Sequence, residues 1–415
     1  MRAVIWLALL FAAAVATATL LGRNDALVSI YYGGWRLDLS LNLFLLILSA
    51  AVFGAYRFMR TADSLWNLPN RAREWRALKR ERAAEAALRE ALAELFAARF
   101  ARAQRASQHA LELQADVPAL KDDVQFGILA RTIAASALHH LQNREGRNRQ
   151  VEEALTLGGQ GVRASSAHEG IMLLNAEWAV DDRQAERGLT LLSELPPGVG
   201  RRTQALRLKL RSTQLLRRPL EALQTARLLA KHQGFSKEAA QSLLRSLAVE
   251  ALEQTYDLEQ LRRAWQALDQ ADRVDAWVVA RAARQACSLG DAGLGRYWLQ
   301  AVWPDLGKYA PEARAQLALA LVECAPGLGS DWLPRVESAL AMHGHEPALV
   351  AAAAMAFSDR QLWGKARRLL EQTATADGLP ATVRRQALRC LAALAREEGQ
   401  NDSAAVFDQR AAAID

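Results

Sequence analysis

The chain has 415 residues, of which 51% are hydrophobic, and it carries a net charge of +7. This length exceeds one compact domain unless the fold is a barrel or a repeat array. Residues 1–82 hold 11 Lys and Arg against 5 Asp and Glu, so most of the excess positive charge lies beside the most hydrophobic part of the chain. This placement favours a membrane surface and argues against a nucleic-acid binder.

Two uncharged runs near the N-terminus predict a membrane hairpin in residues 1–60. Residues 3–21 contain no charged side chain and nearly span a bilayer core of about 30 Å. Residues 39–56 form a second uncharged run. The small residues at 14–18 would also suit a signal-peptide cleavage site, so a cleaved leader is the alternative for the first run. The second run would anchor the chain in either case.

The loop between the two runs predicts a short β-hairpin. In "LVSIYYGGWRLDLS" the pair Gly33-Gly34 separates two strand-like stretches, and such a two-residue turn is typical of a hairpin. Tyr31, Tyr32 and Trp35 lie near the ends of the predicted spans, where amphipathic rings prefer the membrane interface.

A basic segment follows the second run and predicts the orientation of the chain. Residues 61–82 are expected to form an amphipathic juxtamembrane helix, which either lies on anionic lipid or serves only as a linker. The positive-inside rule places this segment and everything after it in the cytoplasm. The orienting residues are Arg57, Arg60, Arg71, Arg73, Arg76, Lys79, Arg80 and Arg82.

Residues 83–415 alternate helical runs with short breaks. In "RQLWGKARRLLEQ" (360–372), Gly364-Lys365 is expected to be the turn into a second helix that packs closely through Ala366. Similar segments recur at intervals of 33–39 residues, a pattern that resembles tetratricopeptide repeats. We therefore expect an all-α solenoid of seven to nine helical hairpins. The expected packing residues are Ala185, Ala222, Leu261, Trp265, Gly295, Leu299, Leu333, Trp363, Ala366, Leu370 and Ala404.

The three cysteines are expected to be small buried core residues. Cys287, Cys324 and Cys390 are far apart and include no CxxC pair, which argues against a disulfide framework or a zinc site. Most tryptophans at helical positions are also expected in the core, whereas Trp303 and Trp332 lie next to breaks and could line a groove.

None of the catalytic motifs tested for is found. A P-loop would need a glycine where the chain has Asp359 and a Ser or Thr where it has Ala366, and no GxGxxG or HExxH motif occurs. The chain is therefore expected to be no enzyme and to need no cofactor. The loop pair His343 and His345 could ligate heme iron, although a polar turn that happens to contain histidines is the alternative.

The order of these features resembles the HemY-type proteins of proteobacteria. The resemblance rests on the "LVSIYYGGWRLDLSL" loop, the basic "RAREWRALKRERAAEAALREAL" segment and the "LWGKARRLLE" repeat. It implies a multi-pass protein of the bacterial inner membrane with a cytoplasmic tetratricopeptide-repeat region, associated with a late step of protoheme IX biosynthesis. The same name is used for a flavin-dependent protoporphyrinogen oxidase, and the lack of a dinucleotide-binding fingerprint argues against that activity here.

Three functions fit these expectations. The first is a non-enzymatic scaffold that binds heme-biosynthesis enzymes at the lipid bilayer. The second is a heme or porphyrin carrier with His343 or His345 as iron ligand, and the third is a general membrane assembly adaptor.

Overall fold

The computed structural model describes residues 26–66, 68–157, 165–232, 234 and 236–414, with the side chains of Leu45 and residues 60–74 excepted. The chain divides into two compact units, residues 1–150 (unit 1) and residues 151–415 (unit 2). Helices dominate both units, so the predicted all-α class is confirmed for these residues. The first predicted span, residues 3–21, lies outside the described residues.

Unit 1 begins with a two-stranded antiparallel hairpin. Strand β1 (Leu27–Tyr32) pairs with strand β2 (Trp35–Ser40), in a register that sets Tyr32 opposite Trp35 and Leu27 opposite Ser40. Gly33 and Gly34 form the turn with φ angles of +58° and +92°. A two-residue turn of this kind needs positive φ at both positions, which explains the glycine pair.

Helix α2 (Leu41–Trp66) follows β2 directly. Its segment Leu41–Met59 is the one helix, within the described residues, that is long and apolar enough to cross a membrane. The span was expected at residues 39–56, but Leu39 and Ser40 belong to β2. The apolar helical stretch therefore begins two residues later than predicted and ends at Met59 instead of residue 56.

Helix α3 (Leu68–Phe96) joins the basic segment to the first helical pair. We expected a juxtamembrane helix to end at residue 82, but this position falls inside one continuous helix. The C-terminal half of α3 packs with α4 (Phe100–Asp116) and α6 (Val124–His140), the short helix α5 (Pro118–Lys121) packs on α4, and α7 (Arg144–Thr156) comes next. The small core of unit 1 consists of Ala84, Ala87, Ala110, Val117, Leu120, Phe126 and Ala130.

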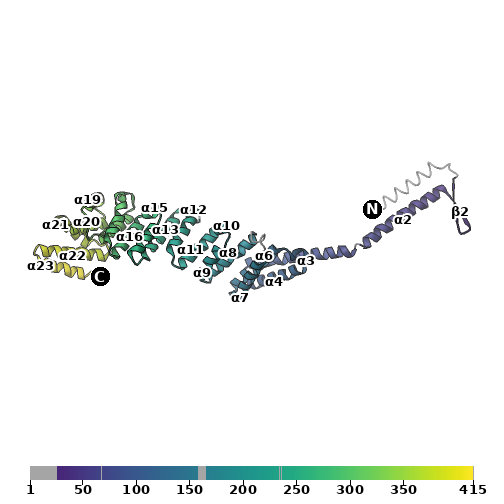
Figure 1. Cartoon of the computed structure of the whole chain (residues 1–415), viewed down its shortest axis with the longest axis horizontal. Coiled ribbons are helices and arrows are strands. Elements are labelled where there is room, and N and C mark those ends of the chain that lie inside the picture. The colour runs from purple at the N-terminus through teal and green to yellow at the C-terminus, as the bar shows by residue number, and fades with distance from the viewer. Residues whose placement is uncertain (1–25, 67, 158–164, 233, 235, 415) are drawn as a thin grey trace. The chain divides into compact units, whose positions relative to one another are not determined.

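Unit 2 is an array of helical pairs, seven in its described part (Figure 1). The three short helices beside them are α10 (Pro197–Gly200), α15 (Gln270–Arg273) and the 3-10 helix η1 (Trp303–Lys308). The pairs are α8 (Ser166–Asp181) with α9 (Ala185–Ser193), α11 (Thr203–Leu215) with α12 (Pro219–Lys231), α13 (Lys237–Glu253) with α14 (Leu258–Ala267), α16 (Ala276–Ser288) with α17 (Ala292–Val302), α18 (Pro311–Glu323) with α19 (Trp332–His343), α20 (Pro347–Asp359) with α21 (Trp363–Thr375), and α22 (Ala381–Glu397) with α23 (Asn401–Ala412).

Most pairs close with the same three-residue turn. Its middle residue has positive φ, and the amide of the next residue donates to the carbonyl five residues back, as Leu362 does to Phe357 at 2.8 Å. This is a Schellman-type helix end. In α20–α21 the turn is therefore centred on Gln361, whereas Gly364, which we expected to form the turn, lies inside α21. The middle residues are Ala98 and Gln142 in unit 1 and Arg183, Arg217, Gly290, Gln361 and Gly399 in unit 2.

Exchanging residues at two of these turns should shift stability in opposite directions. Gln361→Gly should raise the free energy of unfolding by roughly 0.5 kcal/mol, because glycine removes the left-handed strain at a small entropic cost. Gly290→Ala should lower it by about 1 kcal/mol, because its φ is +90°. Urea unfolding of the full chain in detergent, followed by circular dichroism, measures both changes. A loss of stability in Gln361→Gly would contradict the strain argument.

The predicted packing residues lie on the second helices of successive pairs. The fourth helical residue is buried in α12, α14, α17, α21 and α23, where it is Ala222, Leu261, Gly295, Ala366 and Ala404. Leu299 and Leu370, one turn later, are fully buried, while Trp265 and Trp363 are half-buried.

In two of the repeats another residue is packed beside the predicted one. In α9 Ala185 is buried, and Gly188 is also in close contact, since a Cβ atom on Gly188 would lie 2.7 Å from the Val180 side chain of α8. In α19 Leu333 is half-buried and packs against the core of unit 2. The buried face there consists of Trp332, Val336 and Ala339.

Two expectations are wrong, the absence of a disulfide and the groove position of two tryptophans, although Cys324 is buried in the core as expected. Cys287 and Cys324 form a disulfide, with Cα atoms 5.8 Å apart. They lie near the ends of α16 and α18, the first helices of consecutive repeats, so a separation of 37 residues places them side by side. Trp303 and Trp332 do not line a groove, because both are buried and their rings meet edge to face at 5.3 Å.

Candidate partner-binding groove

A cavity of 590 Å³ opens on one side of unit 2 between helices α12, α13, α15 and α16. Its wall is mainly apolar and includes a few charged side chains, as is usual for a binding site. The neighbouring helices of a repeat array form such surfaces because each pair is slightly rotated against the next. The lining residues are Ala230, Lys237, Ala240, Gln241, Leu244, Arg245, Ala271, Asp272, Asp275 and Val278.

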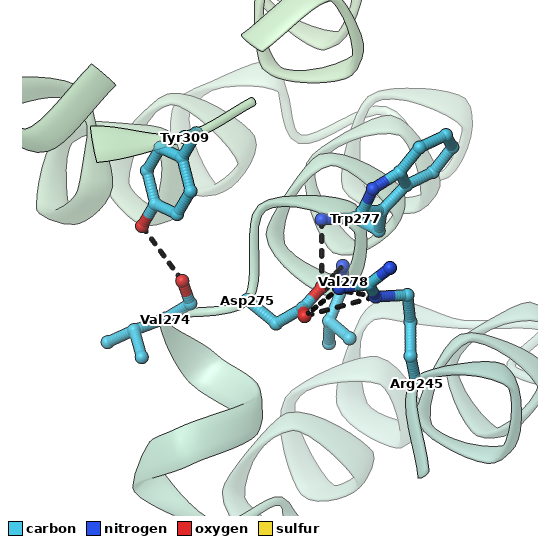
Figure 2. A network of polar contacts seen from close by, with 6 residues as sticks. All are labelled: Arg245, Val274, Asp275, Trp277, Val278 and Tyr309. Atoms are coloured by element: carbon cyan, nitrogen blue, oxygen red, sulfur yellow. Dashed lines mark hydrogen bonds and ion pairs between the residues drawn. The ribbon is translucent and has the colours of Figure 1, made fainter. Parts of the chain in front are cut away.

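Arg245 and Asp275 both line this cavity and form an ion pair with each other, which Figure 2 shows from close by. Arg245 on α13 donates from Nε and Nη2 to the Asp275 carboxylate, with a shortest distance of 2.8 Å. Asp275 is also the N-cap of α16 and accepts from the backbone amides of Trp277 at 3.0 Å and Val278 at 3.3 Å. One carboxylate thus fixes both the start of α16 and its contact with the preceding repeat.

Two aromatic side chains flank this ion pair (Figure 2). The Arg245 guanidinium lies 5.9 Å from the centroid of the Trp277 ring, a cation–π contact, and Trp277 is 36% exposed. Trp277 was expected to be a core residue, but it lies on the surface next to the groove. The Tyr309 hydroxyl donates to the Val274 carbonyl at 2.8 Å. Burial raises the pKa of Tyr309, so the hydroxyl stays protonated and keeps this hydrogen bond at neutral pH.

A second ion-pair cluster includes another lining residue, Asp272. Arg227 on α12 bonds Asp272 and approaches Asp269 at 2.9 Å. Burial raises the pKa of Asp272, and the Arg227 charge opposes this shift. Three of the four charged lining residues, Arg245, Asp272 and Asp275, are in ion pairs, and the rest of the wall is mostly apolar. Sequence reasoning missed this site.

The predicted heme ligands, His343 and His345, lie at the turn between α19 and α20. Their ring centroids are 6.5 Å apart, and each has a ring nitrogen within 4.0 Å of the Glu346 carboxylate. His345 is exposed, while Nε2 of His343 is buried without a hydrogen-bond partner. Glu346 itself pairs with Arg314 at 2.5 Å. The structure therefore places both imidazoles beside a buried ion pair, and the described residues contain no group of three metal-ligating side chains.

The predicted orienting residues lie on α2 and α3. Arg57 and Arg60 are in α2, and Arg71, Arg73, Arg76, Lys79, Arg80 and Arg82 are in α3. Where their side chains are described they are exposed, and Lys79 lies 5.3 Å from the centroid of the Trp75 ring. This geometry is compatible with a basic surface next to α2, and the side of the membrane on which it lies remains a prediction.

Comparison with solved structures returns a chain from an entry described as "Structure of Naa15/Naa10 bound to HypK-THB". The two chains share 14% sequence identity with a TM-score of 0.25. The match covers 76% of this chain and 56% of that chain, so it spans little more than half of the solved chain. A search of curated proteins gives no match.

Comparison with protein-family models gives a match over residues 27–125, to the family described as "HemY protein N-terminus". The matched region starts at the first residue of β1 and includes the hairpin, α2, α3 and α4. The family model therefore covers both the apolar helix and the first helical pair. This match supports the resemblance drawn from the sequence: residues 27–125 are similar to the N-terminal region of HemY-type proteins.

Proposed function

We propose that this chain is a membrane-attached, non-enzymatic scaffold that acts in a late step of heme biosynthesis by holding pathway enzymes. The observation that carries the proposal is the HemY N-terminal match over a hairpin, an apolar helix and the first helical pair, followed by a helical-repeat array with an open groove. The N-terminal part attaches the chain to the bilayer, and the array binds proteins, as tetratricopeptide-type arrays do.

The orientation is part of this proposal. We propose that the repeat array faces the cytoplasm of a bacterial cell and that residues 3–21 form a further span, because the excess basic charge follows α2. Alkaline phosphatase fused after residue 415 should then be inactive, whereas active enzyme there would place the array on the other side of the membrane.

The binding step can be tested by blocking the groove. Ala271 is exposed and lines the cavity, while its neighbour Gln270 is exposed but does not line it. Ala271→Arg should place a long charged side chain in the groove and reduce partner capture several-fold, because burying this charge without a counter-ion is costly. Gln270→Arg adds the same charge outside the groove and should leave capture unchanged.

The measurement is chemical crosslinking in native membranes, followed by affinity purification of the full chain and mass spectrometry. Enzymes that act on porphyrins should be recovered with the unmodified chain and with Gln270→Arg, and should be depleted with Ala271→Arg. Recovery of only unrelated membrane proteins would reject the heme-pathway scaffold and favour the general assembly adaptor. Equal recovery of porphyrin enzymes by all three proteins would exclude the groove as the binding surface.

A second candidate function is the direct carriage of heme or porphyrin. The observation that favours it is the buried Nε2 of His343, which has no hydrogen-bond partner. If this nitrogen ligates heme iron, hemin titrated into the full chain should give a shifted Soret band that is lost in His343→Ala and retained in His345→Ala. A spectrum identical to that of free hemin would reject the carrier.

A further inference from the structure

The β-hairpin has two chemically different faces. Side chains of residues paired directly across the strands point to the same face, and successive pairs alternate. One face carries three apolar pairs, and on the other face each pair includes at least one polar or charged residue. The apolar pairs are Val28 with Leu39, Ile30 with Leu37, and Tyr32 with Trp35, and the other pairs are Leu27 with Ser40, Ser29 with Asp38, and Tyr31 with Arg36.

The polar face is bonded within itself. The Ser29 hydroxyl donates to the Asp38 carboxylate at 2.5 Å, and Nε of Arg36 donates to the same oxygen at 2.9 Å. The Arg36 guanidinium also lies 5.9 Å from the centroid of the Tyr31 ring. The hydrogen bond from Ser29, and then that from Arg36, lowers the pKa of Asp38, so this face stays charged at neutral pH. Such a face is suited to water.

Within the described residues the apolar face is exposed toward the tip of the hairpin, whereas Val28 and Leu39 near its base are half-buried. Tyr32 is 87% exposed, Trp35 81%, Leu37 57% and Ile30 43%. A two-stranded hairpin is only marginally stable by itself in water, and a contiguous apolar patch is usually covered by a partner or a membrane. Something outside the described residues is therefore expected to cover this face.

The position of the hairpin, at the start of the apolar helix α2, indicates what covers its apolar face. The amide of Leu41, the first residue of α2, donates to the Ala26 carbonyl at 3.1 Å, and the Leu43 amide bonds the Ser40 hydroxyl at 3.4 Å. These bonds join the base of the hairpin to the start of the apolar helix. Strands of six residues reach about 20 Å, so a hairpin fixed there can lie along the membrane surface over its whole length.

We infer that the apolar face of the hairpin lies on the lipid interface at the end of the membrane where α2 begins, with the polar face turned to water. This inference rests on the proposed membrane attachment. Tyr32 and Trp35 at the tip suit this location, because aromatic rings with a polar atom prefer the region between hydrocarbon and water. The hairpin then lies beside the end of α2 on the membrane surface and limits the tilt and rotation of this helix.

A labelling experiment on the full chain tests the inference. Single cysteines are introduced at Ile30 or Leu37 on the apolar face, and at their neighbours Tyr31 or Arg36 on the polar face. Each is coupled to an environment-sensitive fluorophore in vesicles of phosphatidylethanolamine and phosphatidylglycerol. Of the native cysteines, two form a disulfide and Cys390 is partly buried with a raised thiol pKa, so labelling favours the introduced exposed thiol. The unmodified chain serves as the labelling control.

The two faces should respond differently. Labels at positions 30 and 37 should be quenched several-fold more by lipids that carry a nitroxide near the headgroup, and labels at 31 and 36 should be quenched more by iodide in water. Iodide quenching at all four positions would overturn the inference, since the hairpin would then stand in water. Labels at 30 and 37 that neither quencher reaches would also overturn it, because protein would cover the face.

Flotation of the same vesicles separates this inference from the proposed function. A chain that fails to float with lipid would reject the membrane attachment itself. A chain that floats, but whose hairpin shows no difference between faces, would reject only the placement of the hairpin on lipid.

Discussion

Gly295→Ala is expected to lower the free energy of unfolding of unit 2 by about 1–3 kcal/mol, because the added methyl group overpacks the contact between two repeats. A Cβ atom at this position would lie 2.7 Å from Sγ of Cys324, 2.9 Å from the Ala283 carbonyl oxygen and 3.2 Å from Sγ of Cys287. The carbonyl belongs to the backbone of α16 and cannot rotate away. The helices would have to separate, although alanine is otherwise the better helix former.

Gly364→Ala is the matched control for this substitution. Gly364 also lies in the first turn of a second repeat helix, but a Cβ atom there would meet nothing within 4 Å. Its replacement should raise stability by up to about 1 kcal/mol through helix propensity alone. Thermal unfolding of both variants as full chains in detergent gives the comparison. If Gly295→Ala were as stable as Gly364→Ala, the helices would not pack at the described distance.

The sequence allowed the positions of close contact to be predicted better than the turns. Close packing of the two helices in a pair requires a small residue at the same position of each repeat. Ala222, Gly295, Ala366 and Ala404 therefore lie at equivalent positions. The turns were harder to locate, because five of the seven left-handed positions hold residues other than glycine. Tertiary packing overrides local preference there, and a search for glycine alone selects Gly364, which is helical.

The disulfide was missed because cysteine spacing was compared with local motifs only. In a repeat array, residues separated by about one repeat lie side by side on neighbouring first helices. Cys287 and Cys324 are 37 residues apart, which falls within the repeat intervals in the sequence. In such folds, two cysteines separated by about one repeat length should therefore be considered as a possible disulfide, in addition to cysteines at short metal-binding spacings.

The groove could not be predicted for a related reason. Its lining includes residues that form ion pairs between neighbouring repeats, such as Arg245 with Asp275, which are 30 residues apart. Other pairs share this pattern, among them Arg211 with Asp181 at 3.0 Å. Opposite charges near one repeat apart are thus a signal in the sequence. However, charged residues are frequent enough in this chain that the signal becomes specific only once the helix register is known.

Arg314→Met is expected to lower the free energy of unfolding by about 3–5 kcal/mol, since it would leave a buried carboxylate without its counter-charge. Arg314 on α18 and Glu346 before α20 are each 9% exposed, and the guanidinium donates to both carboxylate oxygens. It also donates to the Tyr309 carbonyl at 2.6 Å. Adding Glu346→Leu should recover a large part of the loss, because an apolar pair of similar volume removes the stranded charge.

An exposed ion pair elsewhere in the array provides the control. Lys365 on α21 approaches Glu337 on α19 at 2.7 Å, but the two side chains are 62% and 47% exposed. Lys365→Met should therefore cost less than about 1 kcal/mol. Urea unfolding of the three variants, as full chains in detergent, measures the difference. Equal losses for Arg314→Met and Lys365→Met would mean that water reaches the Arg314–Glu346 pair. A double variant no more stable than Arg314→Met would show that the pair itself, and not the stranded charge, holds α18 to α20.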